Sequence, residues 1–219
     1  HQGIALTSDF REESLVKAVK SALDIAKFTQ PDPYIGLPDP RQLAVTWPDL
    51  SLKHSWGISI SEATDLAIAC EKKAMAQPQI RYSEGVEVSA YESIRVFGNS
   101  LGFLNVFESS RHSLNCSLVA ERNGLKESDY EYTVARDPKD LWTIDRVALS
   151  AAKKTVERLG ARQVKTQQVP VLFSPSVAAG LFRHVLSAIS GGALYQRASF
   201  LCDSLGKSLK SRLGRRNYT

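Results

Sequence analysis

The segment HSLNCSLVAERNGLKESDYEYTVAR, residues 112–136, carries the clearest signal for the fold of this 219-residue chain. Two runs of alternating apolar and polar residues, 112–121 and 129–136, flank the dipeptide Asn123-Gly124. Asn-Gly between two such runs is typical of a tight hairpin turn, because both residues tolerate the left-handed backbone conformation. The segment therefore predicts two antiparallel strands.

The same period of two extends towards the N-terminus as far as Ile80, with a second turn signal at Gly98-Asn99-Ser100. Towards the other end, Tyr130 and Tyr132 alternate with Glu131, as expected for a sheet with one buried face. We predict a meander of five strands, with the sequences VEVSAYES, SIRVFGN, GFLNVFES, HSLNCSLVAE and DYEYTVAR.

Helical periodicity surrounds this meander. The predicted helices span residues 9–28, with Ser8 or Asp9 as the cap, a second segment from Ser59 to about Pro78, a third from Asp137-Pro138 to Gly160, and a fourth over 176–190. Ser59 and Glu62 have the spacing of a capping box. The run VPVLFS, residues 169–174, predicts a short buried strand. The fold class expected is α+β, with an antiparallel β-meander flanked by helices and the start of a second β-rich domain.

The composition and charge of the chain argue against a membrane protein and against a specific nucleic-acid-binding protein. Hydrophobic residues make up 43% and charged residues 23% of the chain, as in an ordinary soluble globular protein. No apolar run approaches the length of a membrane span, so we expect no membrane partner. The three cysteines, Cys70, Cys116 and Cys202, are far apart and odd in number, which favours reduced thiols in a cytoplasmic protein. The net charge of +5 equals the five basic residues of 207–219. We therefore expect no specific binding to nucleic acid.

Residue patterns alone do not predict a self-sufficient catalytic site. His1, His54, His112 and His184 share no helical turn, so no two-histidine zinc motif is present. Arg111 and His112 are interpreted as a solvent-facing pair rather than a recognition pair. Gly191-Gly192 follows a helix, which favours a C-cap and a bend over a phosphate loop. A triad of Ser190, His184 and Asp203 would be defined only by geometry, which the sequence does not give.

Several blocks of sequence resemble one known family. They are ALDIAKFTQPDP (22–33), RVFGNSLGF (95–103), SSRHSLNCSLVAE (109–121), DYEYTVARDPKDL (129–141) and VPVLFSPSVAAGLFRHVLSAISGGALYQRASFLCDSLG (169–206). Together they are similar to the PmbA/TldE branch of the TldD/PmbA family, in order and with similar spacing.

This resemblance implies a cytosolic bacterial metallopeptidase made of TldD and TldE subunits, which degrades or matures unfolded and leader peptides. The TldD subunit carries zinc on a helix with an HExxxH motif. The resemblance also implies an alternative, since PmbA-type proteins are described as modulators of DNA gyrase. We expect the present chain to be the non-catalytic partner, acting with a TldD-like subunit on an extended peptide, and the alternative is a non-enzymatic regulator or an inactive fragment.

The same resemblance locates a degenerate metal site on helix 176–190. Arg183, His184 and Ala188 stand where the TldD branch has His, Glu and His. We therefore expect no catalytic residue and no metal ligand in this chain, and zinc only in the partner. Candidates for the shared substrate cavity or the subunit contact follow this helix, namely Gly191, Gly192, Tyr195 and Arg197.

The resemblance also predicts how the chain is divided. We expect the end of an N-terminal domain (1–30), a Pro-rich linker (31–57), a central α/β domain (58–163), the start of a C-terminal domain (168–206) and an aberrant basic tail (207–219). The ending KSRLGRRNYT does not resemble the β-rich continuation of the family. We therefore expect a fragment shortened at its C-terminal end, in which VPVLFS and helix 176–190 expose apolar faces and favour aggregation.

Overall fold

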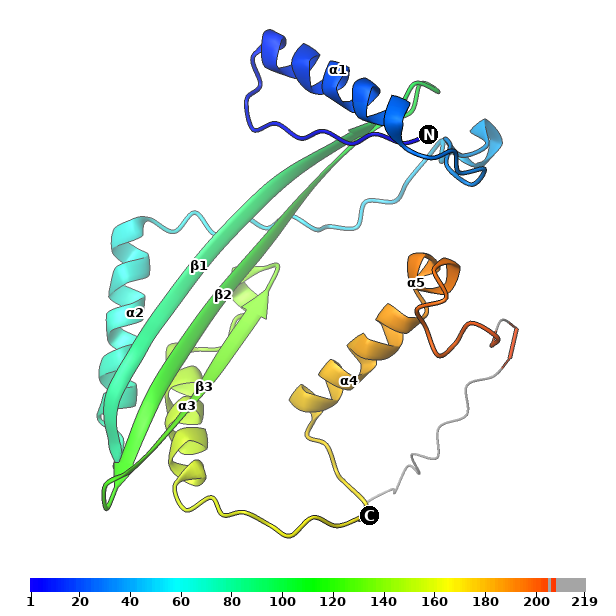
Figure 1. The fold of residues 1–219 in the computed structure, drawn as a ribbon. Coiled ribbons are helices and arrows are strands. Elements are labelled where there is room, and N and C mark those ends of the chain that lie inside the picture. Colours follow the sequence, from blue (N-terminus) through cyan, green and yellow to red (C-terminus); the bar gives the residue numbers. More distant parts are fainter. Residues whose placement is uncertain (205, 208–219) are drawn as a thin grey trace. The chain divides into compact units, whose positions relative to one another are not determined.

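The computed structural model describes residues 1–204, 206 and 207, and the chain divides into two compact units, His1–Arg162 and Gln163–Thr219 (Figure 1). Each unit is described by itself. The predicted basic tail lies outside the described residues, apart from Lys207. No helix in the described part of the chain is both long and apolar enough to cross a membrane.

The centre of the first unit is a three-stranded antiparallel sheet in the order β1-β2-β3. The strands are β1 (Ile80–Gly98), β2 (Leu104–Arg122) and β3 (Leu125–Ala135). The meander and both turns are confirmed, and Asn123 and Gly124 have the positive φ angles, 53° and 79°, that the tight turn requires.

The prediction of five strands is wrong, because β1 and β2 each run through the positions where we expected a break. Ser93 pairs with Ser109 in an uninterrupted ladder. Their hydroxyl oxygens lie 2.9 Å apart in a hydrogen bond across the strands. The apparent breaks are therefore small polar residues that face each other inside one long hairpin.

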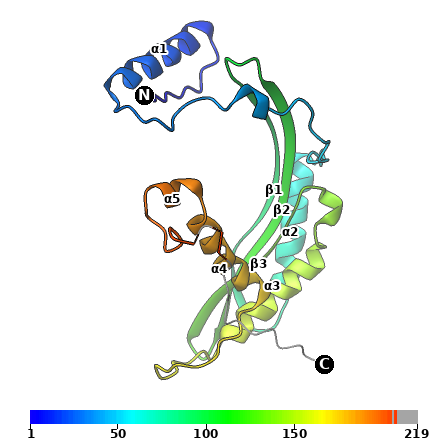
Figure 2. The same cartoon turned by 90° about the vertical axis from the view of Figure 1, so that its right-hand side faces the viewer.

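Helices α2 (Ile60–Met75) and α3 (Ile144–Arg158) cover one face of this sheet (Figures 1 and 2). The capping box of α2 is confirmed, since Ser59 and Glu62 exchange both of its hydrogen bonds. Helix α3 begins later than predicted. Asp137 caps only a 3₁₀ turn, Pro138–Asp140, and Thr143 caps the helix itself.

The core of this unit lies between these two helices and the even-numbered residues of β2. Small side chains on α3 allow the helix to approach the sheet closely, which favours dense packing. The members of this cluster are Cys70, Ala74, Ile80, Leu114, Cys116, Leu118, Ala120, Val147, Ala148, Ala151, Ala152 and Leu159.

On β3, the structure buries the polar face and exposes the aromatic one. Tyr130 and Tyr132 stack with ring centroids 6.3 Å apart and are each at least half exposed. Glu131 is only 8% exposed and accepts hydrogen bonds from Ser150 Oγ (2.7 Å) and Lys154 Nζ (2.8 Å). A buried carboxylate needs such partners, and α3 supplies them. The alternation predicted a half-buried strand, but it did not indicate which face is buried.

Helix α1 (Glu12–Phe28) begins three residues later than predicted, and no side chain caps it. Asp9 instead binds Arg11 and accepts from Ser14 Oγ at 2.7 Å. The N-terminal residues fold back along this helix. A Cβ on Gly3 would lie 1.9 Å from the carbonyl oxygen of Ala22, so only glycine fits there.

The second unit contains helix α4 (Pro175–Ala188) and helix α5 (Gly191–Tyr195), and the helix predicted over 176–190 is confirmed as α4. The strand predicted for VPVLFS is absent from the described residues. This stretch forms no regular secondary structure, and Val171 and Leu172 are mostly exposed. An apolar run forms a buried strand only where a neighbouring strand and a core exist to receive it.

The pKa of Glu131 leads to a first prediction. Burial would raise this pKa, but hydrogen bonds from Lys154, from Ser150 and from the main chain of Tyr132 lower it below its usual value. Ionised Glu131 therefore stabilises the fold at pH values above the ordinary glutamate pKa. This contribution is lost as the pH falls through the lowered pKa of Glu131 in the folded protein. We expect Glu131→Gln to lower the free energy of unfolding by roughly 1–2 kcal/mol at neutral pH, and the variant to lose less stability than the wild type under acid.

Urea denaturation between neutral and acid pH, followed by circular dichroism, measures both effects. Glu127→Gln is the matched control on the same strand. Glu127 lies 3.9 Å from Arg158 in an exposed pair, whose contribution we expect to be below about 0.5 kcal/mol. Equal losses in the two variants, or an unchanged acid slope for Glu131→Gln, would contradict this account.

Candidate functional site

A buried polar cluster forms where β3 ends and the linker segment reaches β2. Ser110 is 1% exposed, and its main-chain N–H donates to the carbonyl oxygen of Leu52 at 2.9 Å. Its hydroxyl accepts from the N–H of His54 (2.8 Å) and donates to the carbonyl oxygen of Arg136 (2.9 Å). One serine therefore holds three separate segments together.

His112 extends this cluster. Its ring is fully buried, its Nε2 lies 2.7 Å from the carbonyl oxygen of His54, and the edge of Trp56 packs against it at 5.5 Å. Since a carbonyl oxygen only accepts, Nε2 carries the proton. The expectation that His112 faces solvent is wrong, because it lies two residues before Leu114 and so on the same buried face. Arg111, on the other face, is exposed.

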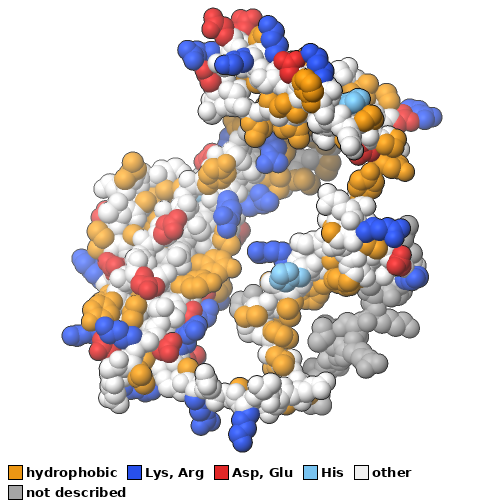
Figure 3. Space-filling view, in the orientation of Figure 1, with side chains coloured by type: hydrophobic (Ala, Val, Ile, Leu, Met, Phe, Trp, Pro, Cys, Tyr) orange, Lys and Arg blue, Asp and Glu red, His pale blue; other side chains and the backbone are white. Residues whose placement is uncertain are grey.

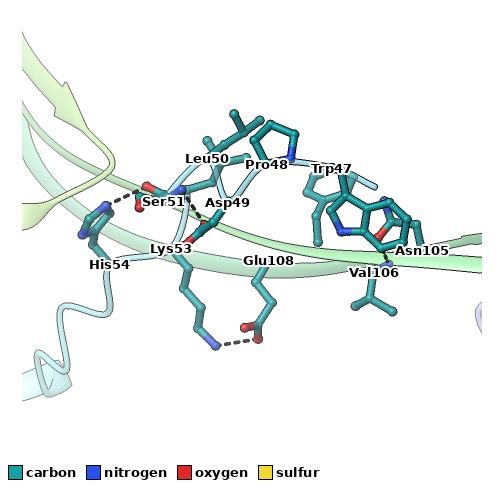
Figure 4. Close-up of a pocket in the computed structure, with 12 residues that line it drawn as sticks. Trp47, Pro48, Asp49, Leu50, Ser51, Lys53, His54, Asn105, Val106 and Glu108 are labelled. Carbon is teal, nitrogen blue, oxygen red and sulfur yellow. Dashed lines mark hydrogen bonds and ion pairs between the residues drawn. The ribbon is translucent and has the colours of Figure 1, made fainter. Parts of the chain in front are cut away.

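A groove of about 800 Å³ opens beside this cluster (Figure 4). One wall is the linker segment Trp47–His54, and the other is the strand segment Asn105–Glu108. Lys53 Nζ and Glu108 Oε1 form an ion pair at 2.6 Å that joins the two walls. At the far end, Trp47 packs against Phe103 with ring centroids 6.3 Å apart. The groove is thus lined by apolar side chains, the Lys53–Glu108 ion pair, the polar residues Asp49, Ser51, His54 and Asn105, and the main chain of a strand.

The cluster does not have the arrangement of a catalytic triad. The hydroxyl of Ser110 is bonded to main-chain groups and is not in contact with an imidazole acceptor. His54 directs Nε2 to the carbonyl oxygen of Ser51 (2.8 Å), and its Nδ1 lies 3.5 Å from Asp137. These contacts order the wall of the groove, so the arrangement is suited to binding rather than to bond cleavage.

The residues predicted as a degenerate metal site lie on α4. Arg183 and His184 are exposed, and Ala188 is half-buried. A zinc site needs three or four converging donors, whereas this set offers one imidazole. Among the residues that the structure describes, no three His, Cys, Asp or Glu side chains gather as a metal-binding group. This donor set does not fit zinc.

Three of the predicted cavity residues lie within the short helix α5, and Arg197 follows it. Gly191 and Gly192 open this helix, capped by Ser190, so the expectation of a C-cap bend is wrong. Tyr195 is 63% exposed. Arg197 has a left-handed φ of 53°, and its N–H donates to the carbonyl oxygen of Leu194, which ends the helix as a C-cap motif does.

Apolar side chains are also exposed along α4 (Figure 3), in agreement with the exposure predicted for this helix. They include Val177, Leu181, Phe182 and Leu186 on the helix and Ile189 at its C-cap.

Residues 53–159 match the model of the PmbA/TldA metallopeptidase central domain, and residues 166–213 match that of the PmbA/TldA metallopeptidase C-terminal domain. The chain belongs to the PmbA/TldA metallopeptidase family. The groove and the polar cluster lie mostly within the central domain of this family, and α4 and α5 lie within the part that matches its C-terminal domain.

Curated relatives agree with this assignment. The chain is 41% identical to metalloprotease PmbA of Escherichia coli O157:H7 and 42% identical to a metalloprotease PmbA homolog of Haemophilus influenzae. Each match covers 95% of this chain and 46% of the relative. The chain thus spans about half the length of the curated relatives that it matches.

Solved structures share the fold. A Bacteroides thetaiotaomicron protein, proposed as a modulator of DNA gyrase, matches with a TM-score of 0.81 at 20% identity, over 92% of this chain and 47% of its own. TldE from Thermococcus kodakarensis matches with a TM-score of 0.69 at 22% identity, over 91% of this chain and 45% of its own. The predicted α+β class is confirmed.

Sequence reasoning missed Ser110, His54 and the groove. The available signal was the spacing of Ser110, His112, Leu114 and Cys116, which places the serine and the histidine on the buried face of one strand. Their partners, however, lie far away in the sequence.

Ser110→Ala tests the importance of this cluster. The substitution leaves the N–H of His54 and the carbonyl oxygen of Arg136 without their partner, and we expect the free energy of unfolding to fall by about 1–3 kcal/mol. We also expect proteases to cut the segment 47–54 faster. Thermal unfolding and timed proteolysis measure these changes.

Ser109→Ala is the control, since Ser109 is the next residue and bonds only to Ser93 on the other face. We expect it to lose less stability than Ser110→Ala and to leave the protease sensitivity of segment 47–54 unchanged. If the two variants behaved alike, Ser110 would not be the organising contact.

Proposed function

We propose that this chain is a PmbA/TldE-type subunit of a zinc-dependent peptidase, and that it holds an extended peptide while a TldD-like partner cleaves it. Support comes from membership in a metallopeptidase family and from the 41% identity to metalloprotease PmbA. The observation that carries the non-catalytic role is the set Arg183, His184 and Ala188, which offers neither a pair of zinc-binding histidines nor a glutamate base.

In this proposal the partner contributes the chemistry. Zinc bound there supplies Lewis-acid activation of the peptide carbonyl and of the attacking water. The present chain contributes surface that positions the peptide, which lowers the entropic cost of reaching the reactive arrangement. Gly191, Gly192, Tyr195 and Arg197 are proposed to line the shared cavity or the subunit contact. The proposed location is the cytoplasm, where this subunit would bind neither a membrane nor specific nucleic acid.

The test is cleavage of a labelled unstructured peptide by this chain alone, by a TldD-like partner alone and by their mixture, each with and without EDTA. We expect EDTA-sensitive cleavage by the mixture that exceeds cleavage by the partner alone. In the mixture, Tyr195→Ala should raise KM, whereas Phe200→Ala, at another exposed aromatic residue of the same unit, should not.

Two controls separate the alternatives. Replacing the zinc-binding residues of the partner should abolish the activity of the mixture. Cleavage by this chain alone would contradict the non-catalytic role. No gain over the partner alone would contradict the subunit role and would favour a regulator that acts by binding only.

A further inference from the structure

One edge of β2 lacks a neighbouring strand over part of its length. Pairing of β2 with β1 covers Leu104 to Ala120, whereas pairing with β3 begins only at His112. Within the described residues, the segment 104–111 therefore has a strand partner on its β1 side only. The outer edge of this segment borders the groove described above.

The main-chain groups at this edge alternate in direction. The N–H of Ser110 donates to Leu52 and so points away from β1. Because a strand has a period of two, the N–H and C=O groups of Glu108 and Val106 point to the same side. Among the described residues, the N–H of Val106 donates to Oδ1 of its neighbour Asn105 at 2.7 Å and has no strand partner on this side. This edge thus presents donors and acceptors in the spacing that an added strand requires.

The opposite wall turns at Ser51. Asp49 Oδ1 accepts from the N–H of Ser51 at 2.8 Å, and Ser51 has a left-handed φ of 46°, so the chain turns there. The hydrogen bonds that the described residues give between the main chain of the wall and the strand lie at the end of the groove, where Leu52 and His54 bind Ser110 and His54 binds His112. The remaining space lies between the open edge and the side chains of Trp47 and Leu50 (Figure 4).

We propose that this groove binds an extended peptide segment, which adds as a strand to the open edge of β2 at Val106 and Glu108. The main-chain bonds would make binding tolerant of sequence, and the exposed rings of Trp47 and Phe107 would receive alternate apolar side chains. Lys53 and Glu108 neutralise each other, and Asp49 adds one further carboxylate to the lining. This inference deepens the proposed function, because it places a peptide-holding surface in the central domain.

Two substitutions in the full-length chain form a matched test. Val96 and Val106 are direct partners across the β1–β2 hairpin, in a position where both N–H groups point outward, to opposite edges. Proline at either position removes an outward N–H and leaves the ladder between β1 and β2 intact. Val106→Pro blocks the groove edge, and Val96→Pro blocks the other edge.

The probe is a short fluorescent peptide of alternating Thr and Val with Lys at both ends, and binding is measured by fluorescence anisotropy. We expect about fivefold weaker binding by Val106→Pro, since one main-chain hydrogen bond is lost, and unchanged binding by Val96→Pro. Circular dichroism checks that both variants are folded. Methylation of single peptide nitrogens should weaken binding at every second residue.

Three results would overturn the proposal. They are equal binding by Val106→Pro and wild type, equal losses in both proline variants, and a dimer in sedimentation that the peptide does not displace. Binding is measured without partner or zinc, so the two proposals can fail separately. Cleavage by the mixture together with normal binding by Val106→Pro would leave the subunit role standing and refute the edge site.

Discussion

The hydroxyl of one buried serine holds the central domain together at the point where its sheet changes width. Ser110 binds the linker through His54 and the end of β3 through Arg136. On one side of it, β2 has two neighbouring strands and a layer of helices. On the other side, β1 is the one strand that pairs with β2 among the described residues. The unfavourable burial of the Ser110 hydroxyl is offset by these hydrogen bonds, which also fix the groove wall, whereas the buried Nδ1 of His112 has no hydrogen-bond partner among the described residues.

Beyond Ser110, the β1–β2 hairpin continues as a two-stranded ribbon with apolar side chains exposed on both faces, among them Ile94, Phe97 and Leu104. A ribbon of two strands has little stability of its own in water. Exposed apolar patches and open strand edges are features through which proteins bind other polypeptide chains. The ribbon therefore depends most on contacts with other parts of the chain for its stability. It is also the part of the domain best suited to hold a peptide.

Local patterns predicted what local physics decides. The Asn123-Gly124 turn and the capping box of α2 depend on neighbouring residues, and both are confirmed. The family was also predictable from sequence blocks. The prediction of a buried strand at VPVLFS was wrong, because the burial of a strand depends on a partner strand. The Ser110 cluster was missed because His54 lies 56 residues away in the sequence, and no periodicity reports such a contact.

The most direct measurement is hydrogen exchange of individual amides in this ribbon, observed by NMR on the free chain. The account predicts that exchange alternates along β2, slow at Phe107 and Ser109, which bond to β1, and fast at Val106 and Glu108, which face the groove. Added peptide should slow the fast set only. Uniform protection of all four amides in the free chain would mean that the edge is already occupied, and would contradict the account.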